Sequence, residues 1–393
     1  PATPGQPEKQ PMPIPLRVAL FDRESGQHGG ERLVILDTAA GEFRFDGCPA
    51  DPVLSINRGF SAPVAIDVDS TQQDLVFLAA RDDDPFSRYE AMQSLITRHL
   101  IAAVGGMDDG RRADERAAIG GAMAAILEDG ALDDSMRGEL MILPAVSYLA
   151  EQLLVADPVA LHLEREGLKE WLGAELGDRL RGLHDRTCAV PYGRDSAARG
   201  ARKVKTQALV YLAAGDPAEA ARRAGAQYDA ADNMTDRQGA LMVLCGLDCP
   251  EREHALADFY QRFVGNALVI DKWFSLQAGS LHPRVYDHVV ALRAHPEFTL
   301  NNPNRVRALY MAMMGAPLAF HRADGAGYRL IADLILALDP INAQTAARFV
   351  PPLGRWRRIE PGRSALMRTE LERIAASPVL SRDVLEQVSK SLG

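Results

Sequence analysis

Three side chains near the C-terminal end of the chain have types and spacing that suit the binding of a peptide. Gln344 and Arg348 are four residues apart in a helix predicted over residues 342–350, so both should project from one face. Arg307 lies in the first turns of a helix opened by Pro303, where the helix dipole favours an anion. Two arginines and an amide facing a concavity would suit a peptide carboxylate or backbone carbonyls. Solvent-exposed or salt-bridged side chains would give the same pattern.

Metal chemistry has no matching motif. A zinc peptidase helix needs His-Glu-x-x-His, because residues four apart reach one zinc ion while the glutamate activates its water. None of the nine histidines is followed by glutamate. Pro283 interrupts the pair His282 and His288, and the pair His288 and His295 lacks an acidic third ligand in the same run. We interpret these histidines as surface or packing residues and expect the chain itself to bind no metal or other cofactor.

Other reactive groups have structural interpretations. Cys245 and Cys249 have half of a zinc pattern, but a helix end before Pro250 accounts for their spacing. The segment Gly325-Ala326-Gly327 follows no predicted strand, which a dinucleotide-binding fingerprint would need, and is interpreted as a tight turn before the helix that holds Tyr328. Neither a Gly-x-Ser-x-Gly motif nor a P-loop occurs. The sequence therefore predicts no catalytic residue in this chain.

Charge and hydropathy argue against nucleic acid and membrane as partners. Trp356 among Arg355, Arg357 and Arg358 has the basic and aromatic character of a nucleic-acid contact, but the chain carries a net charge of -9. The apolar stretches end well short of the ~18 residues that suggest a membrane span. The 47% hydrophobic and 25% charged residues are typical of a soluble folded protein.

The N-terminus and the cysteines favour a cytoplasmic fragment. Residues 1–16 contain six prolines and no basic start before an apolar segment, which argues against a secretory signal and favours a fragment boundary. The four cysteines show no disulfide framework, as expected in a reducing compartment.

The sequence changes character once along the chain, from a predicted β region to a predicted helical region that holds the candidate peptide-binding residues. Short β-branched or aromatic runs separated by turn residues predict a small β-sandwich within residues 1–83. The six predicted strands are Leu16–Phe21, Arg32–Asp37, Glu42–Phe45, Val53–Asn57, Pro63–Val68 and Leu75–Leu78.

From residue 84 to residue 393 apolar residues recur at helical spacing, with Gly, Pro and Asp breaks every 12 to 20 residues. Asn302 before Pro303 and Ser381 are expected to cap helices, and Thr235 with Gln238 has the form of a capping box. Around fifteen helices in this region cannot form one compact bundle. An α-solenoid of stacked helical hairpins with a concave face is expected.

Several ordered motifs give the chain a resemblance to the C-terminal region of bacterial aminopeptidase N, a zinc exopeptidase family. The resemblance covers essentially the whole chain. The motifs are Pro1-Ala2-Thr3-Pro4-Gly5-Gln6-Pro7, Phe86-Ser87-Arg88-Tyr89, Asp232-Asn233-Met234-Thr235-Asp236-Arg237, Asp271-Lys272-Trp273-Phe274, Asn302-Pro303-Asn304-Arg305-Val306-Arg307, Phe320-His321, Asp324-Gly325-x-Gly327-Tyr328 and Ser381-Arg382-Asp383-Val384.

The resemblance implies an Ig-like β-sandwich followed by a helical superhelix that closes the active-site chamber of the enzyme. It also implies that the zinc ligands, the general base and the catalytic tyrosine lie in an upstream domain, so that this chain alone is inactive. Its partners would be the enzyme's own N-terminal and catalytic domains and the peptide substrate. Arg307, Gln344 and Arg348 match family positions that face the chamber. A free-standing α-solenoid interaction module remains the alternative.

Overall fold

The computed structural model describes residues 3–393, so Pro1 and Ala2 of the first motif lie outside it. The chain divides into two compact units, which are residues 1–144 and 145–393. Unit 1 contains a small sheet and the first four helices, whereas unit 2 is helical.

The sheet of unit 1 has three antiparallel strands in the order β2-β1-β3. Leu16 pairs with Val34, and Val18 pairs with Ile56, so their side chains share one buried face. Ala62 completes this small core. The strands are β1 (Ile14–Asp22), β2 (Arg32–Leu36) and β3 (Pro52–Ile56).

Three of the six predicted strands are wrong. Glu42–Phe45 and Pro63–Val68 are irregular, although Phe45 and Val64 pack against the core of the sheet. Residues 75–78 belong to helix α1 (Gln72–Arg81), because Thr71 and Asp74 form a capping box. The Thr71 hydroxyl accepts from the Asp74 amide at 3.1 Å, and the Asp74 carboxylate accepts from the Thr71 amide at 2.8 Å. Apolar side chains thus reach the core without a backbone ladder, and a local cap decides between helix and strand.

The prediction of a large helical region is confirmed. Twenty α-helices occur in the described residues, and nineteen of them lie in residues 84–393, more than the fifteen expected there, because several are single turns. In unit 1 they are α1, α2 (Pro85–Val104), α3 (Asp109–Glu128) and α4 (Asp134–Leu140), with the short 3-10 helix η1 (Arg58–Phe60) before them. In unit 2 they are α5 (Val146–Glu151), α6 (Pro158–Glu175), α7 (Gly177–Cys188), α8 (Ser196–Gly215), α9 (Pro217–Ala230), α10 (Met234–Cys245), α11 (Pro250–Phe263), α12 (Ala267–Ala278), α13 (Val285–Leu292), α14 (Pro303–Met314), α15 (Pro317–Phe320), α16 (Ala326–Leu338), α17 (Ala343–Ala347), α18 (Val350–Gly354), α19 (Pro361–Ala375) and α20 (Arg382–Leu392), with the 3-10 helix η2 (Arg355–Arg358) after α18.

Helix starts follow the capping chemistry of the sequence, with one correction. Asn302 accepts from the amides of residues 304 and 305 at the start of α14, and Ser381 accepts from the Val384 amide at the start of α20, as predicted. Thr235 is not a cap. Asn233 caps α10 instead and accepts from the Asp236 amide at 3.0 Å. A better cap two residues earlier therefore starts the helix.

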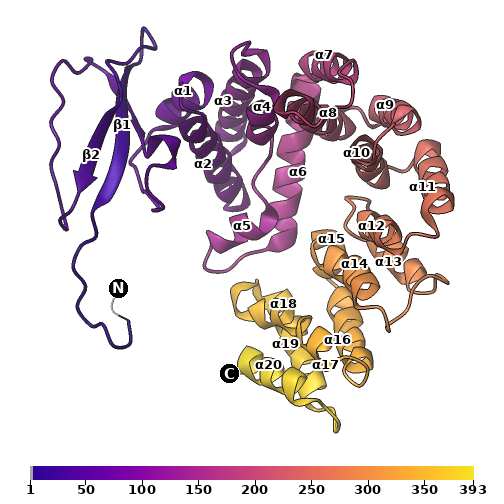
Figure 1. The fold of residues 1–393 in the computed structure, drawn as a ribbon. Helices are drawn as coiled ribbons and strands as arrows, with labels where there is room; N and C mark the ends of the chain where they lie inside the picture. Colours follow the sequence, from indigo (N-terminus) through magenta and orange to yellow (C-terminus); the bar gives the residue numbers. More distant parts are fainter. Residues whose placement is uncertain (1–2) are drawn as a thin grey trace. The chain divides into compact units, whose positions relative to one another are not determined.

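Unit 2 is built in two layers along an arc (Figure 1). Helices α8, α10 and α12 lie on the inner side, and α7, α9 and α11 lie on the outer side. Alternate helices pack on one another along the inner layer, as α8 does on α10 and α12 on α14. One apolar cluster extends from Leu209 on α8 to Val388 on α20. This arrangement of stacked hairpins is the predicted α-solenoid.

Candidate substrate-facing groove

An open groove of about 580 Å³ lies between α12 and α14, and Arg307 is one of its lining residues. The lining residues come from two helix faces at helical spacing, which places them in two rows along neighbouring helices. They are Leu268, Asp271, Lys272 and Ser275 on α12, and Asn304, Arg307 and Ala308 on α14.

A buried ion pair holds the two helices together. Arg305 on α14 is 2% exposed, and its Nε donates to Asp271 Oδ1 at 2.5 Å. Its Nη1 donates to the Glu297 carbonyl at 2.5 Å, and its guanidinium lies 4.8 Å from the centre of the Phe274 ring. The pair joins the Asp271-Lys272-Trp273-Phe274 motif to the motif that contains Arg307. Asp271 is therefore neutralised within the helix pair.

The groove presents positive charge without a counter-charge. Lys272 is exposed, and among residues 3–393 its ammonium has no hydrogen-bond or ion-pair partner. Arg307 donates to the Pro303 carbonyl at 3.2 Å and to Asn304 Oδ1 at 2.5 Å, and neither acceptor is a carboxylate. Leu268 adds an apolar side chain that is 69% exposed. Two cations beside an exposed leucine can bind a carboxylate and an apolar side chain of one peptide.

Gln344 and Arg348 lie on one exposed face, as their spacing predicts. Gln344 is in α17, and Arg348 is its C-terminal cap residue. Both are exposed, whereas Thr345 and Ala346 between them are buried. Neither side chain has a partner in the part of the chain that the structure describes.

The segment with Gln344 and Arg348 lies near the helix that holds Arg307. Tyr310 on α14 and Phe349 pack edge to face with their ring centres 6.4 Å apart. Arg307 is one turn before Tyr310, and Arg348 directly precedes Phe349. The structure thus places the three predicted residues on neighbouring segments, without direct contact between Arg307 and the other two in the described set.

The residues present do not fit a zinc ion. No group of three or more His, Cys, Asp or Glu side chains with metal-binding geometry occurs in residues 3–393. The rings of His282 and His288 are 4.5 Å apart, but the Arg252 guanidinium lies 3.3 Å from His288 Nδ1. Burial and this guanidinium lower the pKa of His288 to about 4. A neighbouring cation would repel a metal ion there.

The remaining predicted groups have structural roles. Cys245 is buried, which raises the pKa of its thiol to about 12 and disfavours a thiolate ligand. Trp356 Nε1 donates to the Ser391 carbonyl at 2.9 Å, and Arg357 donates to the carbonyls of Ser391 and Leu392. These side chains hold the last helix, α20, in place rather than forming a nucleic-acid surface.

No helix in residues 3–393 has the length and apolar character needed to cross a membrane.

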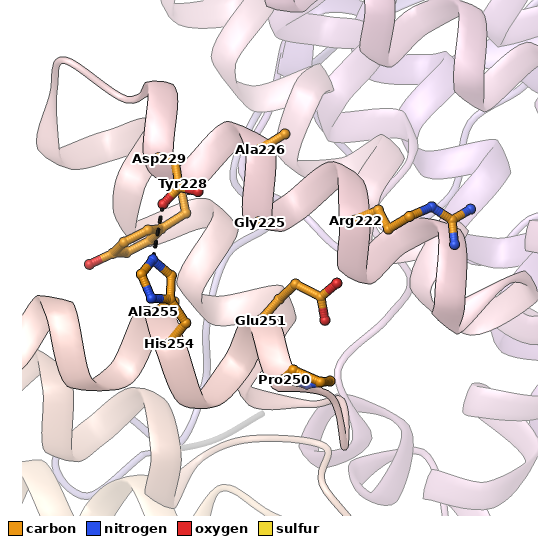
Figure 2. A pocket seen from close by; sticks show the side chains of 9 residues that line it. All are labelled: Arg222, Gly225, Ala226, Tyr228, Asp229, Pro250, Glu251, His254 and Ala255. Atoms are coloured by element: carbon orange, nitrogen blue, oxygen red, sulfur yellow. Dashed lines mark ion pairs between the residues drawn. The ribbon is translucent and has the colours of Figure 1, made fainter.

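A second groove, which the sequence did not indicate, lies between α9 and α11 in the outer layer (Figure 2). His254 and Asp229 form an exposed ion pair across it at 3.5 Å, and Arg222 and Glu251 also line it. Charges of both signs are mixed, so no class of ligand is favoured. No motif in the sequence corresponds to it.

Comparison with known families identifies both parts of the chain. Residues 72–393 match a family model described as a domain of unknown function with ARM repeats, DUF3458_C. The chain belongs to the DUF3458_C family. Residues 1–69 match the companion DUF3458 model, which is described as an Ig-like fold. The prediction of an Ig-like unit followed by a helical solenoid is thus confirmed.

The relatives of this DUF3458_C chain are aminopeptidases. It is 40% identical over 363 residues to aminopeptidase N of Caulobacter vibrioides, with 92% of the chain and 42% of the relative covered. It is 33% identical over 400 residues to aminopeptidase N of Escherichia coli, with 100% and 46% covered. A crystal structure of Legionella pneumophila aminopeptidase A in complex with aspartic acid superposes with a TM-score of 0.84 at 30% identity, covering 97% of this chain and 45% of that one. The chain thus spans less than half the length of these relatives and corresponds to their C-terminal part.

Proposed function

We propose that the chain is the non-catalytic C-terminal region of a cytoplasmic zinc aminopeptidase that removes N-terminal residues from peptides. The main support is the match to aminopeptidase N along 92% to 100% of the chain. Zinc and the catalytic groups would belong to the rest of the enzyme, because the described residues provide no metal site. Residues 1–83 would form an Ig-like domain, and residues 84–393 a helical domain that closes the active-site chamber.

In this proposal the inner layer of unit 2 contacts the distal part of the peptide. Arg307, Gln344 and Arg348 are joined in this role by Lys272, which the sequence reasoning missed. The support is that Lys272 lines the same groove as Arg307 and has no partner among the described residues. The sequence alone does not single out Lys272, because its neighbour Asp271 could pair with it. The structure shows that Asp271 is instead paired with Arg305.

The first test is an assay of the isolated chain on aminoacyl anilides with zinc added. We expect no turnover above background, because the described residues hold no zinc-binding cluster. Turnover that a chelator abolishes would contradict the proposal.

The second test uses the full-length enzyme with Arg348→Ala or Lys272→Met. Each substitution should lower kcat/KM for a peptide of five or more residues by about 5- to 20-fold, equivalent to ~1–2 kcal/mol for a lost charged contact. Hydrolysis of an aminoacyl anilide should be unchanged, because so short a substrate does not reach the groove. Arg262→Ala on the outer helix α11 is the control and should affect neither substrate. Equal losses on both substrates would argue against this role.

A further inference from the structure

The two ends of unit 2 meet through their backbones. Ala156, in the linker between α5 and α6, donates its N–H to the Arg358 carbonyl at 2.8 Å. The Glu360 amide donates to the Ala156 carbonyl at 2.9 Å, which makes a parallel bridge between Ala156 and Ile359. In Figure 1 the α5 end of the arc accordingly lies beside α18 and α19.

Side chains reinforce this joint from the C-terminal side. Arg358 Nη2 donates to the Leu153 carbonyl at 2.9 Å and to the Glu151 carbonyl at 3.2 Å, across 205 and 207 residues of sequence. A cation there also complements the negative end of α5. The Arg355 guanidinium lies 3.4 Å from a Glu151 carboxylate oxygen.

A third arginine, Arg363, couples the joint to the start of α6. Asp157 caps α6 by accepting from the amides of Val159 and Ala160 at 2.9 and 3.0 Å. The same oxygen accepts from Arg363 Nη1 at 3.2 Å. Arg363 Nε donates to the His321 carbonyl at 2.6 Å, so one guanidinium connects α6, α19 and the end of α15.

The joint contains many polar contacts for its size. In a solenoid each repeat contacts only its neighbours, and burial of apolar surface holds them together. The large apolar cluster of unit 2 includes Ile359 but no residue of α5 or α6. Hydrogen bonds and ion pairs close the arc together with a small amount of packing, because α6 also contacts α15 and Ala156 is buried. The ion pair of Arg355 and Glu151 is partly exposed, with side-chain exposures of 62% and 52%.

We propose that this joint, formed by residues 151–157 and 355–363, is a polar latch that closes unit 2 into a ring and opens without unfolding of the hairpins. Local opening is easiest where few apolar contacts must be broken. Closure fixes the curvature of the inner layer, because the first and last hairpins can no longer move apart. Opening of the latch would let the hairpins shift against one another. The latch is independent of the proposed peptidase role.

Hydrogen exchange on the complete chain tests the latch. Within residues 3–393 the amides of Ala156 and Glu360 are bonded only across the joint, so they should exchange faster than the amides of Leu168 inside α6 and Leu371 in α19. Arg358→Met should accelerate exchange at Ala156 and Glu360 at least 10-fold and leave Leu168 and Leu371 unchanged. Arg357→Met is the matched control, because within the described part of the chain this neighbouring arginine contacts α20 carbonyls and Trp356 and no latch residue before α6. It should leave the latch amides unchanged.

Two further measurements keep the test decisive if Arg358→Met folds poorly. Raising NaCl from 0.05 to 0.5 M should accelerate exchange of the two latch amides of the unaltered protein several-fold, because salt screens exposed ion pairs. A disulfide introduced with Ala156→Cys and Ile359→Cys should remove this salt effect. Exchange of the latch amides at the rates of Leu168 and Leu371 under all conditions would overturn the proposal, because the joint would then open only on unfolding.

Discussion

At the residue scale, the buried side chains in the motifs that resemble aminopeptidase N have structural roles. Arg305 is buried and paired with Asp271, and Tyr328 is buried with its hydroxyl 2.8 Å from His321 Nδ1. Lys272 and Arg307 belong to the same motifs but face the groove. Arg305 and Asp271 therefore hold α12 and α14 together, whereas Lys272 and Arg307 beside them line the groove.

The buried pair should be essential for stability. Arg305→Met leaves Asp271 without its cation in a site where the carboxylate is only 14% exposed. We expect a loss of about 2–4 kcal/mol in the free energy of unfolding, measured by urea denaturation. Arg307→Met on the same helix removes an equal charge from the groove and should cost less than about 0.5 kcal/mol. Similar losses for the two variants would show that the Arg305–Asp271 pair contributes no more to stability than an exposed arginine does.

Buried His321 should make the protein sensitive to acid. Burial, with Arg363 nearby, lowers the pKa of His321 to about 4, whereas an unfolded histidine titrates near about 6.5. Below pH 6.5 the unfolded state therefore binds a proton that the folded state does not, and stability falls until about pH 4. This residue should cost about 2 kcal/mol between pH 7 and pH 5.

His321→Gln keeps an acceptor for the Tyr328 hydroxyl and removes the titration. Its free energy of unfolding should fall by about 2 kcal/mol less than that of the unaltered protein between pH 7 and pH 5. The other histidines with lowered pKa are present in both proteins and cancel in the comparison. Identical pH dependence of the two proteins would rule out this assignment.

At the scale of elements, capping residues, prolines and glycines in the sequence predict most helix starts. Close packing decides how the helices approach one another. Pro303 and Ser381 mark helix starts as expected. Residues 75–78 have an apolar run that suits either a strand or a helix, and the Thr71 cap settles the choice. Gly325, with φ of 67°, supplies the predicted turn before α16. The role of Gly327 is different, because it lets α16 approach α15.

A side chain at Gly327 should separate these two helices. A Cβ there would lie 2.3 Å from the Phe320 carbonyl oxygen and 2.4 Å from that of Ala319. Because both atoms belong to the backbone of α15, the clash could be relieved only by moving the helix. We expect Gly327→Ala to lower the free energy of unfolding by about 2–3 kcal/mol. Gly182→Ala in α7 meets nothing within 4 Å and should be neutral or stabilising by up to about 1 kcal/mol. Thermal or urea unfolding of both variants measures the contrast, and a stable Gly327→Ala would contradict it.

At the scale of the whole molecule, the chain consists of two units with separate internal packing, residues 1–144 and 145–393. Within unit 2 one apolar cluster joins the hairpins from α8 to α20, and the polar latch joins the two ends of the unit. The helices of unit 2 should therefore unfold together, whereas unit 1 and unit 2 should unfold less cooperatively with one another.

The positions of the tryptophans allow the unfolding of unit 2 to be measured separately. All three, Trp171, Trp273 and Trp356, lie in unit 2. Tryptophan fluorescence should report the unfolding of unit 2 alone, whereas far-ultraviolet circular dichroism also follows the helices of unit 1. We expect the two urea transitions to differ in midpoint or slope. Superimposable transitions would mean that the units unfold together.

The sequence by itself determined the fold class, most helix starts and the absence of a zinc motif, because caps, breaks and ligand spacing are local properties. It also placed Gln344 and Arg348 on one helix face. Only the tertiary structure decided that Arg305 neutralises Asp271 while Lys272 has no partner among residues 3–393, and that residues 151–157 meet residues 355–363. These are contacts between segments far apart in the chain, and periodicity along one helix cannot specify which distant charge will lie beside it.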